Sequence, residues 1–282
     1  MRAASDWQTE LVEVADGVFA YIQANGGLCI SNAGFIVGDD DVLIVDTLFT
    51  RPMNHEFQAQ IRRVTSKPAR HLVNTHHHVD HTLGNALFPD SCIVAHRMAE
   101  AMMGRMEVPG ILPYAVPHFA ADIEGVPVRM PDIAFEGSLE FDLGGRRVQL
   151  FSFAPGHTAS DVVAYLPREK VLFAGDLAFY RVTPVTLDGH VSGWIRSLDR
   201  ILRMDIDVVV PGHGPIGDLE DLQLVRAYLA LLRRQARRAH ARGLTVEEAV
   251  AGLRLGEYAA WREPERAIFA IARLYREFAG KI

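Results

Sequence analysis

A dense run of histidines lies in the first third of the chain. Residues 74–85 read Asn-Thr-His-His-His-Val-Asp-His-Thr-Leu-Gly-Asn and contain the pattern His-x-His-x-Asp-His at His76, His78, Asp80 and His81. Alternate residues of an extended segment point to the same side, so His76 and His78 can converge on one ion. Asp80 and His81 follow the turn and can face a second ion. Imidazole nitrogens combined with a carboxylate suit zinc, and also iron or manganese.

Three segments in the second half of the chain place a potential metal ligand after an apolar run. The ligands are His157 after residues 148–153, Asp176 after residues 171–174, and His213 after residues 208–210. Glycine stands beside each of them and permits a tight backbone turn. A single histidine after a strand is usually structural, but three such loops downstream of the His-rich motif are difficult to attribute to chance. The sequence therefore predicts a metal site built at the ends of several strands.

The elements that must position these residues are predicted to be strands with helices between them. Apolar runs predict strands at residues 18–22, 29–37, 42–45, 71–73, 93–94, 139–143, 148–153, 162–166, 171–174 and 208–210. The Gly-Asp-Asp-Asp sequence at residues 38–41 predicts a hairpin turn. Helices are expected after Pro52, at residues 96–103 and at residues 194–204. Two β-rich halves that each deliver polar loops favour an α/β fold, with two packed sheets and helices outside them.

The C-terminal part of the chain is predicted to be helical. Leu222, Val225, Leu229 and Leu232 mark one apolar face at helical spacing, and Thr245 with Glu248 matches a capping box. Pro264 is predicted to open a last helix, whose inward residues are Ile268, Ile271, Leu274 and Phe278. We therefore expect a larger domain at residues 1–218, which carries the metal site, and a helical extension packed on it at residues 219–282.

Composition and charge exclude several classes of protein. The net charge of -6 and the pI near 6.0 argue against non-specific nucleic-acid binding, which depends on clustered Lys and Arg. Cys29 and Cys92 adjoin apolar runs, so buried thiols are expected rather than a disulfide framework. The polar residues 1–10 lack the apolar core of a signal peptide, and no apolar run is long enough to span a membrane. The sequence predicts a cytoplasmic protein that acts on a small molecule, with no nucleic-acid or membrane partner; a homodimer is compatible with it.

Residues 18–214 resemble the metallo-β-lactamase superfamily, because the His-x-His-x-Asp-His motif and the other strand-end segments occur in the family's order. The resemblance implies an αβ/βα four-layer sandwich with a two-metal site at one sheet edge, followed here by the helical extension. It implies one metal held by His76, His78 and His157, a second held by Asp80, His81 and His213, and a bridge from Asp176. Asp46 matches the strand-end aspartate that supports the ligands from behind. His77 matches no ligand of the family.

This ligand set, loaded with two Zn²⁺ or with Fe or Mn, predicts a hydrolase. Two divalent ions about 3.5–4 Å apart hold a bridging water, lower its pKa and polarise a carbonyl group. The resulting hydroxide would attack an ester, thioester, lactone or amide-type carbonyl of a small molecule, with Asp80 in the catalytic centre. Tyr180 closely follows Asp176 and is a candidate donor to the developing oxyanion; plain packing is the alternative.

The resemblance leaves the substrate open. Asp176 stands where typical zinc β-lactamases carry Cys or Ser, which favours thioesterases like glyoxalase II and acyl-homoserine lactonases. The alternatives are β-lactam hydrolysis and the activity of a mononuclear iron sulfur dioxygenase of the same fold. His78 argues against the flavodiiron oxidoreductases, which carry Glu at that position.

Two further segments are candidates for contact with substrate. Residues 104–131 contain five prolines among apolar side chains, and we expect them to form one wall of the substrate pocket. A cover on the sandwich or a dimer contact is the alternative. The arginine-rich run at residues 233–238 is expected to be a solvated helix face. A clamp for a carboxylate or phosphate of the substrate is the sharper alternative.

Overall fold

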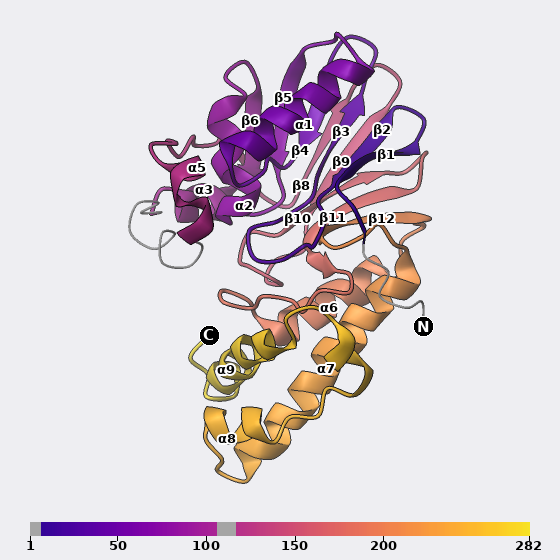
Figure 1. The fold of residues 1–282 in the computed structure, drawn as a ribbon. Helices are drawn as coiled ribbons and strands as arrows, with labels where there is room; N and C mark the ends of the chain where they lie inside the picture. The colour runs from indigo at the N-terminus through magenta and orange to yellow at the C-terminus, as the bar shows by residue number, and fades with distance from the viewer. Residues whose placement is uncertain (1–6, 106–116) are drawn as a thin grey trace.

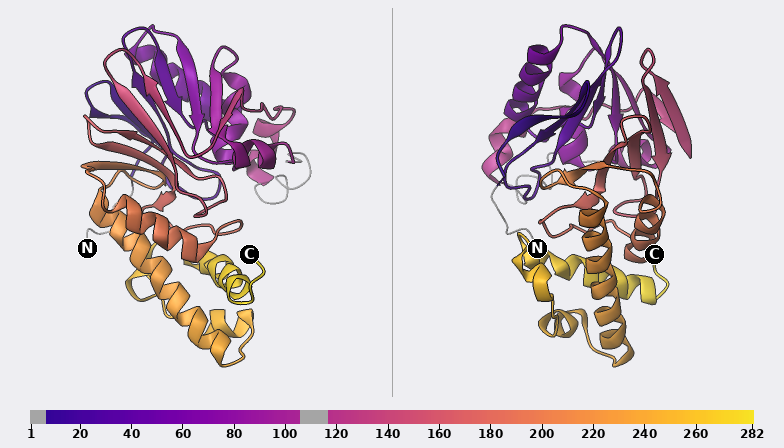
Figure 2. Two further views of the ribbon diagram at one scale, coloured as in Figure 1. Left: turned by 180° about the vertical axis from the view of Figure 1, so that it is seen from behind. Right: turned by 90° about the vertical axis from the view of Figure 1, so that its right-hand side faces the viewer.

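The computed structural model describes residues 7–105 and 117–282 of the chain. The described strands form two β-sheets that pack face to face, and helices lie on the outer side of each sheet (Figure 1). Further C-terminal helices lie beneath the sheets, as both views in Figure 2 show. The predicted α/β class and αβ/βα sandwich are therefore confirmed.

The first sheet has its described strands in chain order. They are β1 (Glu10–Ala15), β2 (Val18–Ile22), β3 (Ala33–Val37), β4 (Val42–Val45), β5 (Ala69–Asn74), β6 (Cys92–His96) and β7 (Ile133–Phe135). Neighbours are antiparallel from β1 to β4 and parallel from β4 to β7. The hairpin expected at residues 38–41 joins β3 to β4. The sequence did not predict β1, because this edge strand is only partly buried and carries a weak apolar pattern.

The second sheet has the order β12-β11-β10-β9-β8. Its strands are β8 (Ser138–Asp142), β9 (Arg147–Ser152), β10 (Val162–Leu166), β11 (Val171–Phe179) and β12 (Val208–His213). β11 pairs with β12 in parallel, and the other neighbours are antiparallel. β11 was predicted to end at Ala174, but it continues through Gly175, where φ is 51° and the register with β12 shifts. Asp176 therefore lies inside a bulged strand and not in a loop after it.

The helices flank the sheets and form the C-terminal layer. They are α1 (Arg51–Val64), α2 (Val79–Thr82), α3 (Arg97–Met103), α5 (Ala120–Ile123), α6 (Val191–Ile201), α7 (Leu219–Ala241), α8 (Val246–Ala251) and α9 (Ala267–Phe278). In β4, Leu43 faces the second sheet and Ile44 packs with α1. In β10, Val162 faces the first sheet and Val163 packs with α6. Because strand side chains alternate, both strands are buried on two faces, which explains their continuous apolar sequences.

The C-terminal extension shares a core with the second sheet. Leu222 and Val225 of α7 belong to the same buried cluster as Trp194 of α6, so one core runs across the expected boundary at residue 218. The capping box predicted at the start of α8 is present. The prediction that Ile268 faces inward is wrong, since the residue is 40% exposed. α9 begins at Ala267, and the side of the helix that packs on the core carries Ala267 and Ala270 beside Ile271 and Leu274.

Two further sequence predictions have mixed outcomes. Both cysteines are free thiols, and Cys29 is buried as predicted. Cys92 is only half-buried, because it is the first residue of β6. Among the helices of the described residues, none combines the length and apolar character needed to cross a membrane.

Candidate metal centre

The His-rich segment follows β5 and is fixed by buried polar side chains. The Asn74 amide donates to the carbonyl oxygen of His81 at 3.0 Å, and the Thr47 hydroxyl donates to the same oxygen at 3.1 Å. The Thr82 hydroxyl donates to the carbonyl oxygen of His78 at 3.0 Å. Because these bonds lie inside the protein, where water competes little, they hold the turn from β5 into α2 in one conformation.

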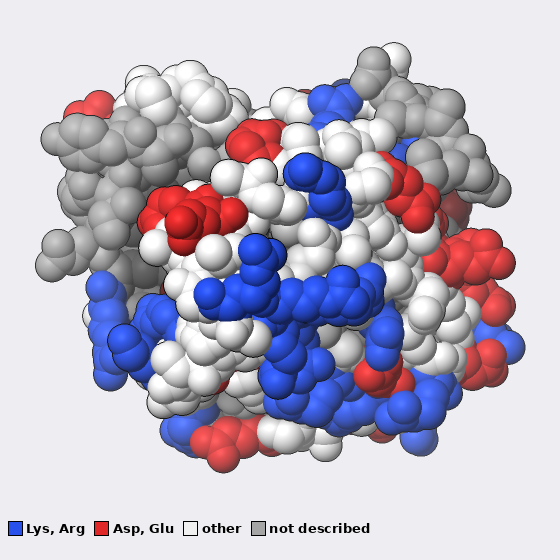
Figure 3. Space-filling model, turned by 90° about the horizontal axis from the view of Figure 1, so that it is seen from below, with Lys and Arg blue, Asp and Glu red and all other residues white. Residues whose placement is uncertain are grey.

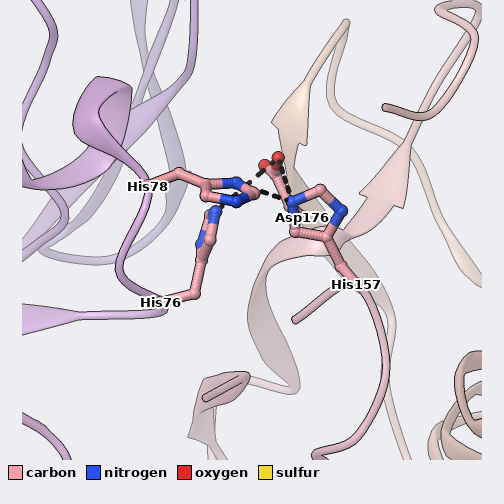
Figure 4. A group of neighbouring side chains, drawn as sticks. All are labelled: His76, His78, His157 and Asp176. Carbon is pink, nitrogen blue, oxygen red and sulfur yellow. Dashed lines mark hydrogen bonds and ion pairs between the residues drawn. The ribbon is translucent and has the colours of Figure 1, made fainter. Parts of the chain in front are cut away.

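Four side chains converge from the two sheets into a cluster that we call the first metal group. It contains His76, His78, His157 and Asp176, whose potential ligand atoms lie within 4.8 Å of one another. His157 Nε2 is 3.0 Å from His78 Nδ1 and 3.2 Å from Asp176 Oδ2 (Figure 4). His76 Nε2 lies 3.8 Å from the same carboxylate oxygen. The figure shows the histidine rings and the carboxylate directed at a common point.

A second cluster adjoins the first and is called the second metal group. It contains Asp80, His81 and His213. His213 Nε2 is 3.3 Å from Asp80 Oδ2, and His81 Nε2 is 3.9 Å from that oxygen. Asp176 reaches this group as well, because its Oδ1 is 3.1 Å from His81 Nε2 and its Oδ2 is 3.5 Å from His213 Nε2. A single carboxylate therefore lies between the two groups.

Hydrogen bonds behind the rings determine which nitrogen of each histidine faces the cluster. His81 Nδ1 is 2.9 Å from Asp46 Oδ2, and His213 Nδ1 is 3.2 Å from the carbonyl oxygen of Gly26. The Thr75 hydroxyl donates its proton to Asp46, so it accepts from His76 Nδ1 at 3.1 Å. These contacts favour a proton on Nδ1 of His76, His81 and His213, so that the neutral ring directs the lone pair of Nε2 into the cluster.

Buried atoms in the two groups lack hydrogen bonds. His76 Nε2 is inaccessible to solvent and makes no hydrogen bond, and His81 Nε2 and Asp176 Oδ1, also inaccessible, face only each other at 3.1 Å without the geometry of a hydrogen bond. A buried polar atom without a partner costs about 1–3 kcal/mol. Cations placed between nitrogen lone pairs and carboxylate oxygens remove this cost. The residues present therefore fit divalent metal ions of the zinc class.

The charges of the cluster agree with a cation site. Burial opposes ionisation of Asp80, but His81 and His213 lower its pKa to about 2. Burial lowers the pKa of His157 to about 3, so this ring is neutral, as a ligand must be. Burial alone would also lower the pKa of His213, but Asp176 and Asp80 raise it to about 9. Without a cation, the carboxylates therefore retain a proton on an imidazole.

The glycines of the site allow close approach of the backbones. A Cβ atom at Gly212 would overlap Asp176 Oδ1, and a Cβ atom at Gly175 would meet the Thr75 side chain. Gly214 has φ of 96°, which other residues rarely adopt, and a Cβ atom there would overlap the carbonyl oxygen of Tyr180. The Asp176 carboxylate can occupy its position because no side chain competes for the space.

Sequence reasoning did not single out Asp188. Its Oδ2 lies 3.1 Å from His78 Nε2 and 3.6 Å from His77 Nε2. The Asp188-Gly189 dipeptide is typical of a turn, and nothing in its local pattern indicates a contact with the His-rich motif. His77 is also held by Ser160, whose hydroxyl lies 3.0 Å from Nδ1. His77 therefore faces away from the two metal groups.

Tyr180 has a structural partner. Its hydroxyl donates to the carbonyl oxygen of Asp218 at 3.0 Å, just before α7, and only 3% of the residue is exposed. Burial, together with Asp221 and Asp218, raises the pKa of this phenol far above its ordinary value. The bond occupies the only proton that Tyr180 could donate to an oxyanion, so that role stays a prediction without a supporting contact.

The expected pocket wall lies partly outside the described residues. Met106, Ile111, Leu112 and Tyr114, named by that prediction, all belong to the segment that is not described. Phe119, which the same prediction named, is described and packs edge-on against Phe49 with ring centroids 5.7 Å apart. In the described part, residues 117–126 therefore cover a small apolar core that includes Leu83, close behind the His-rich turn.

The arginine-rich run lies on α7. Arg234, Arg237 and Arg238 are exposed, and the Arg237 guanidinium lies 4.8 Å from the centre of the Phe278 ring. Figure 3 shows Lys and Arg side chains gathered over the lower face of the molecule. These three side chains agree with a solvated helix face, whereas Arg233 is partly buried; the solvated face and the clamp for a substrate anion both stay predictions.

Comparison with known proteins identifies related sequences. Residues 26–213 match the model of the family described as the metallo-beta-lactamase superfamily. The alpha subunit of 2,4-dinitroanisole O-demethylase from Nocardioides sp. (strain JS1661) is 28% identical over 185 residues, which are 63% of this chain and 51% of that protein. The linear primary-alkylsulfatase from Pseudomonas sp. (strain ATCC 19151) is 26% identical over 269 residues, 81% of this chain and 51% of that protein. The chain thus spans about half the length of these two relatives.

Solved structures show the same fold. A metallo-beta-lactamase from Pontibacter korlensis superposes with a TM-score of 0.63 at 23% identity, covering 79% of this chain and 99% of the other. The stereoselective inverting sec-alkylsulfatase from Pseudomonas sp. superposes with a TM-score of 0.71 at 18% identity, covering 97% of this chain and 51% of the other. The second match includes the C-terminal helices. The family match covers more than half of the chain and the fold agrees with it, so this chain belongs to the metallo-β-lactamase superfamily.

Proposed function

We propose that this protein is a hydrolase that depends on two divalent metal ions, with zinc as the expected metal. It would cleave an ester, thioester, lactone or amide-type bond of a small molecule. The observation that carries the proposal is the position of Asp176 between the two metal groups. Its Oδ1 lies 3.1 Å from His81 Nε2 of the second group, and its Oδ2 lies 3.2 Å from His157 Nε2 of the first and 3.5 Å from His213 Nε2 of the second. Bound ions would supply an activated water and polarise the bond to be cleaved. The chain needs no side-chain nucleophile for this reaction.

The residues of the chain would prepare the site before substrate arrives. Asp46 and Thr75 orient His81 and His76, so that ligand nitrogens face the centre without rearrangement. Asp80 and Asp176 provide negative charge that is already ionised at neutral pH. The ligands, apart from the partly exposed His78, are almost fully buried, which limits competing water and strengthens electrostatic interactions in the site.

Sulfate esters are a second candidate substrate class. The alkylsulfatase relative matches 81% of this chain, and the sec-alkylsulfatase structure superposes over 97% of it, whereas the β-lactamase structure covers 79%. Cleavage of a sulfate ester needs the same elements as cleavage of a carboxylic ester, namely an activated water and a cationic centre for the leaving oxygen. Asp176, which replaces the Cys or Ser of typical zinc β-lactamases, makes β-lactams a weaker candidate.

One experiment tests the proposal and ranks these classes. The protein is stripped of metal, loaded with Zn²⁺, and assayed with a thioester, a lactone, a carboxylic ester, a medium-chain alkyl sulfate and a β-lactam. We expect turnover of at least one class that is lost on chelation and restored by zinc. The Asp176→Asn variant serves as the control for adventitious metal catalysis. Zinc-loaded protein that turns over none of these substrates would refute the hydrolase proposal.

The redox alternative is tested separately. A mononuclear iron sulfur dioxygenase should be isolated with about one iron per chain when no zinc is added during purification, and it should consume oxygen with a persulfide substrate. Protein that instead contains about two zinc-class ions and consumes no oxygen supports the hydrolase.

A further inference from the structure

Asp188 contacts His78, a member of the first metal group. It lies in the segment between β11 and α6, and its Oδ2 is 3.1 Å from His78 Nε2. The other nitrogen of that ring, Nδ1, is 3.0 Å from His157 Nε2 in the first metal group. When the carboxylate accepts the proton of Nε2, the lone pair of Nδ1 is directed toward the ligands. His78 thus faces the cluster with the opposite nitrogen from His76.

The residue that orients His78 lies in a different part of the molecule from the groups that orient the other histidines. His76, His81 and His213 are oriented by groups within the sandwich and are almost fully buried. The side chain of His78 is 20% exposed, and that of Asp188 is 47% exposed. The position of His78 therefore depends on how firmly the Asp188 loop is held.

Arg273 of α9 holds this loop through its backbone. The guanidinium donates from Nε to the carbonyl oxygen of Gly189 at 2.6 Å and from Nη2 to the carbonyl oxygen of Asp188 at 3.1 Å. Two bonds from one planar group fix orientation as well as position. On its other side, the loop is tied to the segment of ligand His157, since His190 N donates to the carbonyl oxygen of Gly156 at 2.9 Å.

A second residue of α9 reinforces the same region. The Glu277 side chain is 5% exposed, and its carboxylate oxygens accept from the backbone nitrogen of Ser192 at 3.3 Å. Ser192 is in the first turn of α6, where backbone N–H groups are free and a negative charge is favourable. α9 therefore binds both the Asp188 loop and the helix that continues from it.

We propose that Asp188 is a positioning residue of the first metal group and that Arg273 sets its place, which makes the C-terminal extension a working part of the metal centre. The inference rests on the proposed metal-dependent function. It gives the extension a role that the family's ligand motif does not provide, because every ligand lies before residue 214. It also explains why a helix so late in the chain makes polar contacts with backbone carbonyls in the middle of it.

The test measures zinc binding and needs no substrate. Stepwise zinc dissociation constants are determined by competition with a chromophoric chelator for the full chain and for Arg273→Ala, Asp188→Ala and Asp188→Asn. Loss of an orienting partner typically weakens metal binding about 10–100-fold. We expect one of the two binding steps to weaken by this factor in Arg273→Ala and Asp188→Ala. Asp188→Asn should retain most of the affinity, since its amide oxygen still accepts a hydrogen bond.

Arg276→Ala is the matched control. Arg276 lies about one helical turn after Arg273 in α9 and is exposed. The Arg276→Ala substitution removes the same side chain and the same charge as Arg273→Ala. Its zinc constants should equal those of the parent. Cobalt-substituted Asp188→Ala should also show altered visible absorption bands, which report ligand geometry and which a loss of packing elsewhere would not move.

Three outcomes would overturn the inference. They are parent-like zinc constants in both alanine variants, equal losses in the Arg276 control, and failure of Asp188→Asn to rescue Asp188→Ala. If Arg273→Ala does not fold, the zinc constants of the Asp188 variants test the inference. Asp188 is exposed, so truncation of its side chain removes no core packing. A parent protein that binds two zinc ions but hydrolyses nothing would refute the proposed function while leaving this test valid.

Discussion

Replacement of Asp46 by asparagine should weaken the second metal group through a histidine that the substitution does not alter. Asp46 is 3% exposed and accepts three hydrogen bonds, from Thr75 N at 2.7 Å, Thr75 Oγ1 at 2.7 Å and His81 Nδ1 at 2.9 Å. Asparagine has nearly the same shape, but it offers one oxygen acceptor and one nitrogen donor. With the amide nitrogen beside His81, that ring must accept at Nδ1 and carry its proton on Nε2, which blocks the metal position.

The size of the effect follows from these contacts. If the amide turns the other way, its nitrogen meets the Thr75 N–H group, and two buried donors face each other at a cost of about 1–3 kcal/mol. The first orientation avoids that cost but leaves His81 in the wrong tautomer. A disturbed orienting partner lowers metal affinity about 10–100-fold, which corresponds to about 1.4–2.8 kcal/mol.

The measurement compares stepwise zinc affinity with the stability of the metal-free protein. Asp41→Asn is the matched control, because Asp41 pairs with His71 at 3.3 Å and contacts no residue of either metal group. We expect Asp46→Asn to lose at least tenfold in one zinc constant, with turnover falling in parallel, while Asp41→Asn binds zinc like the parent. A folded Asp46→Asn protein whose two zinc constants stay within twofold of the parent would refute the tautomer argument.

Four further predictions concern the site and its scaffold. Asp176→Ala should fold but bind about one zinc per chain instead of two by elemental analysis, because two cations held without the carboxylate repel each other; two ions and parent-like turnover would contradict the bridge. Gly212→Ala should lower zinc affinity more than Gly145→Ala, since only the Gly212 Cβ atom would overlap Asp176, and equal affinities would argue against that overlap. Zinc affinity should rise between pH 6 and about 9, because Asp176 and Asp80 keep a proton on His213 against the effect of burial and zinc must displace it. Calorimetry in buffers of different ionisation enthalpy should detect the released protons, and a result independent of buffer would exclude them. Thr245→Ala should lower the free energy of unfolding by about 1 kcal/mol in denaturant titrations, through loss of the α8 cap, with zinc affinity unchanged.

The proximity of several candidate ligands could be predicted from the sequence because much of their geometry is local. His76, His78, Asp80 and His81 lie within six residues, and the turn after β5 is enough to direct them to one side. Continuous apolar runs such as those of β4 and β10 also predicted strands, and the structure shows that these runs are continuous because the strands are buried on both faces. The grouping of distant His157 and His213 with this motif came from the family resemblance and not from spacing.

The tertiary structure decided the features that depend on contacts between distant segments. β11 continues through a bulge at Gly175, so Asp176 lies inside the strand. Only glycine fits at position 175, because a Cβ atom there would meet the Thr75 side chain. Tyr180 follows Asp176 closely in sequence, yet its hydroxyl binds the carbonyl oxygen of Asp218 before α7.

Asp188 shows most clearly where sequence reasoning ended. It is 110 residues from His78, and its contact is created by a loop that Arg273 holds from a third part of the chain. Local patterns record which face of an element is apolar, because burial recurs with the period of the backbone. A hydrogen bond between side chains from unrelated elements has no such period, so only the packed fold determines it.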